Sequence, residues 1–130
     1  MLPLFSTYTA HAIYPNIYVP KHIFDDLKKE VPEPKNVAVL IHEQTHIDRQ
    51  RKMGWLIWGF RYCFSGTFRF EEELTAITAS MKFYKQNNLI WDTNRTANFL
   101  SSYLYLWCIN KRTAKVKLDE IWEKLEEITK

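Results

Sequence analysis

The 130-residue chain is poor in glycine and cysteine and has no long apolar run. It contains three Gly and two Cys, and its longest apolar segments are GWLIWGF (54–60) and YLYLWCI (103–109). Two cysteines are too few for a disulfide framework. Neither segment approaches the ~20 residues that a helix needs to span a bilayer. These absences argue against a disulfide-stabilised scaffold and predict a soluble protein without a transmembrane segment.

The chain also lacks a large excess of charge of either sign. The formal net charge is +3, and the 18 Lys and Arg residues are scattered among 15 acids without a basic run or stripe. Proteins that bind nucleic acid usually carry such a basic patch, so we expect no nucleic-acid partner. The N-terminal stretch MLPLFSTYTAH has no positive residue before its apolar part, unlike a secretory signal, and a cytoplasmic location is therefore expected.

The two cysteines, Cys63 and Cys108, lack the CxxC spacing that is common in zinc sites. We interpret them as two buried thiols. A single disulfide in a secreted form of the protein is the alternative.

Apolar residues, by contrast, are plentiful. They make up 46% of the chain, and aromatic residues make up 15%, with five Trp, seven Tyr and eight Phe. A chain of this length with so much apolar surface can build one ordinary core. We expect a single, helix-rich domain over residues 1–130 rather than a disordered chain.

The first third of the chain predicts a hairpin and two helices. Residues 10–19 are rich in β-branched and aromatic types, and Pro15-Asn16 in their middle suits a tight turn. Residues 20–31 carry apolar side chains at helical spacing, namely Ile23, Phe24, Leu27 and Val31. The next helix is expected from Asn36, as its cap, to about Lys52, with Gly54 as its stop.

The rest of the chain predicts three more helices, over residues 71–88, 92–109 and 116–128. Residues 55–70 fit no single pattern, and their SGT stretch suggests a turn. A short hairpin followed by helices gives the α+β class. We expect a mostly helical domain in which a small N-terminal hairpin packs on the helix of residues 36–52.

The heptapeptide LIHEQTH, residues 40–46, lies inside that helix. Residues four apart on a helix are rotated by about 40° and lie one turn apart on the same face. His42 and His46 can therefore present imidazole nitrogens to one metal ion. Glu43 lies beside them and can reach a water molecule on that ion. This is the HExxH pattern of zinc peptidases, and it predicts one tightly bound Zn²⁺ per chain.

A catalytic zinc site needs a third protein ligand and one open position. The extended metzincin pattern would require Gly at position 49 and His at position 52, where this chain has Arg49 and Lys52. The alternative is a carboxylate from a second, antiparallel helix. Glu71, Glu72 and Glu73 compete for this role. Glu73 is favoured because it lies near the apolar face, and the other two are interpreted as acids of the first helical turn.

HExxH followed by Glu-x-x-Ala on a second helix resembles the gluzincin metallopeptidases, and the short chain is most similar to the small soluble minigluzincins. The resemblance covers roughly residues 10–90. It implies that His42, His46 and Glu73 bind zinc and that Glu43 is the general base. It also implies a substrate-aligning edge strand near residues 10–19.

Several other residues are candidates for supporting roles. Tyr62 is the preferred donor to the developing negative charge of the substrate carbonyl, with Tyr84, His11 and His22 as alternatives. A contact from Asp48 or Gln50 could orient a ligating imidazole. Arg69 could neutralise or orient one of the three acids, or it could be solvated.

Two segments have two interpretations each. The aromatic run Trp55–Phe64 either packs in the core or forms an exposed apolar patch that binds peptide or touches a membrane. The amphipathic helix within residues 110–130 either completes the core or covers the substrate path and keeps the enzyme latent.

The leading functional hypothesis is zinc-dependent hydrolysis of peptide bonds, with a peptide or protein as substrate and narrow specificity. A zymogen-like latency through residues 110–130 would fit it. The alternative, from a different class, is a zinc-binding interaction module without turnover. Glu43 argues against that alternative, because a structural zinc site needs no general base.

Overall fold

The computed structural model describes residues 10–102 and 109–129, with side chains described as far as Glu126. The described part contains two strands and six helices. In chain order these are β1 (His11–Ile13), β2 (Asn16–Tyr18), α1 (Lys21–Leu27), α2 (Pro34–Met53), α3 (Trp55–Phe64), α4 (Gly66–Gln86), α5 (Thr93–Leu100) and α6 (Lys111–Thr129).

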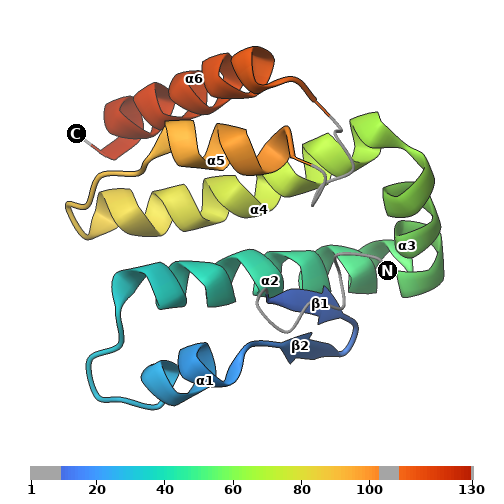
Figure 1. Cartoon of the computed structure of the whole chain (residues 1–130), viewed down its shortest axis with the longest axis horizontal. Coiled ribbons are helices and arrows are strands. Elements are labelled where there is room, and N and C mark those ends of the chain that lie inside the picture. Colours follow the sequence, from blue (N-terminus) through green and yellow to red (C-terminus); the bar gives the residue numbers. More distant parts are fainter. Residues whose placement is uncertain (1–9, 103–108, 130) are drawn as a thin grey trace.

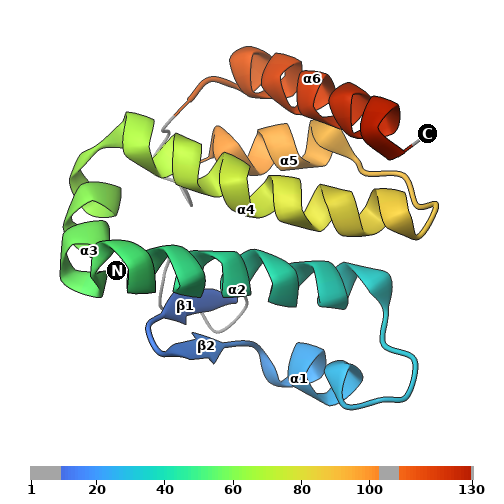
Figure 2. The same ribbon diagram turned by 180° about the vertical axis from the view of Figure 1, so that it is seen from behind.

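The helices form layers around the long pair α2 and α4, which run antiparallel (Figure 1). The hairpin and α1 lie against one side of α2, whereas α5 and α6 lie beyond α4 on the other side of the molecule. The reverse view gives the same order and places α3 at one end, where it joins α2 to α4 (Figure 2). The expected class, a mostly helical α+β domain with a hairpin on the HExxH helix, is confirmed.

The hairpin turns one residue earlier than predicted. Tyr14 and Pro15 form the turn, and Asn16 already opens β2, which pairs with β1 in antiparallel register, Ala12 opposite Ile17. The adjoining helix α1 is shorter than predicted and ends at Leu27. Val31, expected on its apolar face, lies outside it and is 85% exposed.

The start of α2 differs from the prediction in a way that local chemistry explains. Pro34 occupies the first turn, where its missing N–H costs nothing, and Glu33 is the N-cap. Asn36 is therefore not the cap. Its side chain is buried and donates to Asp26 Oδ2 at 2.8 Å, which ties α1 to α2. At the other end Gly54 stops α2 as predicted, with a φ of 94° that favours glycine.

The segment that the sequence left unassigned is helical almost throughout. Helix α3 covers Trp55–Phe64, and Ser65 alone separates it from α4. The Ser65 side chain accepts a hydrogen bond from Phe68 N, so it caps α4. Helix α4 therefore begins five residues before Glu71, and the three acids at 71–73 do not lie in its first turn.

The main apolar core lies between α4, α5 and α6. Its buried members are Ile77, Met81, Ala97, Leu100, Ala114, Leu118 and Leu125. Helix α5 ends at Leu100, and residues 103–108 of the predicted 92–109 helix lie outside the described residues. The apolar face of α6 is used in this core rather than against Trp55–Phe64, so the core-completing interpretation of the C-terminal helix is the one that the packing supports.

Two expectations about composition can also be compared with the described residues. None of the described helices is both long enough and apolar enough to cross a membrane.

Cys63 is exposed and free on α3. This contradicts the expectation of a buried thiol. Cys108 lies outside the described residues.

The role of α6 predicts a stability difference between two variants of that helix. Leu118 is fully buried, whereas Val116 is 52% exposed. Leu118→Ala should lower the free energy of unfolding by about 2–5 kcal/mol, since it leaves a cavity in the core. Val116→Ala should change it by less than about 1 kcal/mol. Urea unfolding followed by circular dichroism measures both, and equal losses would contradict the core assignment of α6.

Candidate metal centre

Three potential ligands converge where α2 faces α4. His42 Nε2 lies 3.0 Å from Glu73 Oε2, and His46 Nε2 lies 3.1 Å from Glu73 Oε1. The two Nε2 atoms are 3.1 Å apart. Among the described residues, these three side chains form a group that can hold a metal ion. The helical spacing of the histidines and the antiparallel return of α4 thus bring together the residues expected from the sequence.

The donor set and its spacing fit zinc. Zinc bound tetrahedrally at ordinary Zn–N and Zn–O lengths places its ligand atoms about 3.3 Å apart. The observed separations of 3.0–3.1 Å need only a small expansion to reach this value. Two imidazoles and one carboxylate form a ligand set that recurs in catalytic zinc sites.

Burial and charge act differently on the two carboxyl groups of the site. Burial would raise the pKa of Glu73, but the adjacent His46 and His42 outweigh it, and the pKa lies well below its usual range. Burial raises the pKa of Glu43 to about 7; His42 opposes this rise and the Glu73 charge adds to it. One carboxylate is thus held ionised among the histidines, whereas burial brings the pKa of the other close to neutral pH, where it can both accept and release a proton.

Tyr62 reaches the site from α3, but through a different contact from the one expected. Its hydroxyl donates to Glu73 Oε1 at 2.6 Å, and its side chain is buried. This bond fixes the orientation of the carboxylate that faces the histidines. Tyr62 is therefore placed to hold Glu73 in position, and its expected role as a donor to substrate stays a prediction.

Ring packing, rather than a hydrogen bond to Nδ1, supports the imidazole of His46 on the side away from the ligand contacts. Its ring makes edge contacts with the rings of Trp58 and Tyr62, with centroid distances of 5.6 and 6.4 Å. The Trp58 and Tyr62 rings stack on each other, with their centroids 4.7 Å apart. Its Nδ1 is buried and has no hydrogen-bond partner in the described part of the chain. Zinc-ligating histidines usually donate this second N–H, so the aromatic wall of α3 takes over the orienting role here.

Neither Asp48 nor Gln50 orients an imidazole as expected. Asp48 is exposed and accepts from Gln44. Gln50 is buried and binds the hairpin: its Nε2 donates to the Ala12 carbonyl at 3.0 Å, and its Oε1 accepts from Tyr14 N at 2.7 Å. Gln50 thus anchors β1 one helical turn beyond His46.

Arg69 is buried and acts on α3. Its Nη1 donates to the Tyr62 carbonyl at 2.6 Å, and its guanidinium lies over the Tyr62 ring, 5.9 Å from the centroid. The solvated interpretation of this arginine is wrong. Arg69 instead holds the helix end that carries Tyr62.

Glu72 has a role that the sequence did not suggest. It is 1% exposed and accepts two hydrogen bonds from Arg49, at 2.5 Å from Nε and 2.9 Å from Nη2. This bidentate pair links α4 to α2 beside the metal ligands and removes Glu72 from the competition with Glu73. The available signal was the basic residue at position 49, three positions after His46 on the same helix.

The remaining candidate donors lie elsewhere in the fold. His11 stacks on Tyr18 within the hairpin, with ring centroids 5.4 Å apart. His22 is exposed on α1. Tyr84 packs against Trp91, and burial raises the pKa of its hydroxyl. Within the described part of the chain, neither His22 nor Tyr84 contacts the three metal ligands, so the geometry favours neither of them for the chemistry of the site.

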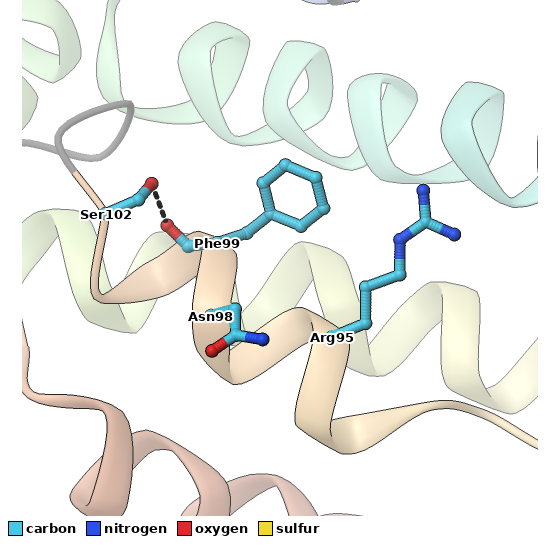
Figure 3. A pocket seen from close by; sticks show the side chains of 4 residues that line it. All are labelled: Arg95, Asn98, Phe99 and Ser102. Atoms are coloured by element: carbon cyan, nitrogen blue, oxygen red, sulfur yellow. Dashed lines mark hydrogen bonds between the residues drawn. The ribbon is translucent and has the colours of Figure 1, made fainter.

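A separate pocket lies along α5. It has a volume of about 310 Å³ and is lined by Arg95, Asn98, Phe99 and Ser102. In Figure 3 the side chains of Arg95 and Phe99 point to the same side of α5, and Ser102 donates to the Phe99 carbonyl. None of the three ligands contributes to its lining, so this pocket is not the candidate site.

Comparison with known proteins adds nothing to this picture, since no family model, curated protein or solved structure matches the chain. The site therefore stands on its own geometry.

The Arg49–Glu72 pair predicts a difference between two neighbouring arginines. Arg49→Met leaves the buried Glu72 carboxylate without its partner, and we expect a loss of about 2 kcal/mol in unfolding free energy. The 3–5 kcal/mol typical of fully buried pairs is not reached, because the Arg49 side chain is 42% exposed. The matched control is Arg51→Met. Arg51 is 65% exposed and reaches Asp48 only at 4.0 Å, so its loss should cost less than about 0.5 kcal/mol. Urea titration of both variants measures the difference, and similar values would mean that the pair does not stabilise the site.

Proposed function

We propose that the protein is a zinc-dependent hydrolase of peptide bonds. The observation that carries the proposal is the convergence of His42 and His46 from α2 with Glu73 from α4. Glu43 is buried next to the histidines on α2. A structural zinc site usually has four protein ligands, whereas a catalytic site has three and one open position. Three described ligands and an adjacent carboxylate correspond to the catalytic arrangement.

The chemistry divides between the ion and the chain. When bound, zinc supplies a water molecule of near-neutral pKa and polarises the substrate carbonyl. The buried Glu43 carboxylate would accept a proton from an attacking water molecule. It would then deliver this proton to the amine nitrogen that leaves. Tyr62 holds Glu73 in place through the bond to Oε1, so that the ligand set keeps its shape.

Latency through the C-terminal helix is not included in the proposal. Helix α6 packs on α4 and α5, and its buried Leu118 and Leu125 belong to the main core. The second candidate function remains a zinc-binding interaction module without turnover. It shares the three ligands and differs in needing no Glu43 carboxylate.

The ligand assignment predicts a contrast between two glutamates of α4. Glu73→Ala removes a ligand and should weaken zinc binding by at least about 100-fold. Glu71 is exposed two residues earlier, and Glu71→Ala should leave the affinity unchanged within about twofold. Competition with a chromogenic chelator measures both dissociation constants, and His46→Ala serves as the positive control for ligand loss. Equal effects of the two glutamate variants would show that Glu73 is not a ligand.

The role of Glu43 separates the enzyme from the binding module. Glu43→Gln keeps the size of the side chain but cannot accept the proton, so it should bind zinc like the parent chain and lose at least about 1,000-fold in cleavage rate. Mass spectrometry of a diverse peptide library incubated with each zinc-loaded protein detects the cleavage. A zinc-loaded parent chain that cuts no peptide would favour the module. A Glu43→Gln variant that cuts as well as the parent would instead show that Glu43 is not the general base.

A further inference from the structure

Helix α3 exposes a continuous apolar surface. Leu56, Ile57, Phe60 and Phe64 are exposed by 67%, 55%, 67% and 77% respectively. They fall on one side of the helix by their spacing, and the rings of Phe60 and Phe64 are in contact, 4.8 Å between centroids. We name these four residues the α3 outer face. The core interpretation of the aromatic run is thus wrong for this face and holds for Trp58 and Tyr62, which are buried.

The outer face points away from the candidate metal centre. Trp58 and Tyr62 lie on the opposite side of α3, where they contact His46 and Glu73. A helix that is apolar on both sides is normally buried on both sides. The inner side is already packed against the candidate metal centre, so the outer face is the side of α3 that is left for a partner.

Exposed basic residues lie next to the outer face along the chain. Arg51 and Lys52 are exposed at the C-terminal end of α2, and Arg61 is exposed at the edge of the face on α3 itself. No acid occurs in the sequence between Asp48 and Glu71. The α3 outer face therefore combines exposed Leu, Ile and Phe side chains with a mainly basic rim, in which Arg51 lies 4.0 Å from Asp48.

We propose that the α3 outer face binds the surface of an anionic lipid bilayer. An apolar helical face enters the boundary between headgroups and acyl chains, and basic residues beside it attract anionic headgroups. Figure 1 shows α3 at one end of the molecule, so that a flat surface can approach it without meeting α1, α5 or α6. Two copies packed symmetrically through this face would bring their cationic rims together, which disfavours a dimer.

The test is sedimentation of the full chain with vesicles. One set contains phosphatidylcholine and phosphatidylglycerol in equal amounts, and the other contains phosphatidylcholine alone. Each basic residue near an anionic surface strengthens binding about fivefold, so three of them predict a preference for the anionic vesicles on the order of 100-fold. The preference should fall steeply in high salt.

Two variants locate the contact. Phe60→Glu should weaken binding to the anionic vesicles by about tenfold or more, because it removes apolar contact and adds a repelled charge. Ile90→Glu is the matched control: Ile90 is 86% exposed in the connection between α4 and α5, and its variant should bind like the parent. Leu56→Ser weakens binding without adding charge and serves as the second variant if Phe60→Glu fails to fold.

Three results would overturn the proposal. The parent chain could fail to sediment with anionic vesicles, or Ile90→Glu could weaken binding as much as Phe60→Glu. Light scattering could also show that the parent chain is a dimer that Phe60→Glu separates, which would make a second copy the occupant of the face. None of these measurements depends on bound zinc or on peptide cleavage, so the outcome is independent of the proposed function.

Discussion

The close antiparallel contact between α2 and α4 is the constraint on which the candidate site depends. His42 and His46 belong to one helix and Glu73 to the other, so a shift of either helix would separate the ligands. Small and fully buried Ala76 permits the close approach, and Ser80 Oγ donates to the Ala38 carbonyl across the interface at 2.7 Å. The Arg49–Glu72 pair fixes the same two helices at the level of the ligands. Apolar packing, one neutral hydrogen bond and one bidentate ion pair thus set the same register.

This interface buries several groups that apolar packing alone would not favour. Glu43, Glu72 and Glu73 are all less than 10% exposed, as is His46. The charge of Glu72 is matched by Arg49, and that of Glu73 is matched by the two imidazoles and the Tyr62 hydroxyl. In the described part of the chain Glu43 has no such match, and its burial raises the pKa to about 7. A carboxyl group kept buried without a partner lowers stability, and such costs are usually found where function requires them.

Local sequence patterns predicted the parts of the site whose residues are close in sequence. Helical periodicity is enough to place His42 and His46 together, and the return of a second helix was implied by the acids and Ala76. The partner of Glu72 was not predictable in the same way, because Arg49 lies 23 positions away and only the α2–α4 register brings it near. The role of Asn36 was not predictable either, because its side chain binds Asp26 instead of capping α2. Helix α3 was not predictable because a helix that is apolar on both sides has no periodic pattern that distinguishes it from irregular chain. Long-range contacts decided each of these cases.

The Gln50 side chain also limits what the hairpin can pair with. A short strand at the edge of a sheet offers unpaired N–H and C=O groups, which are a template for the strand of another chain. The carboxamide of Gln50 presents one donor and one acceptor, as a peptide group does, and it occupies the Ala12 carbonyl and the Tyr14 amide. A peptide extended along this stretch of β1 would have to displace Gln50 first. Residues 12–14 are in this way protected against edge-to-edge aggregation by a side chain of the helix that carries the metal ligands.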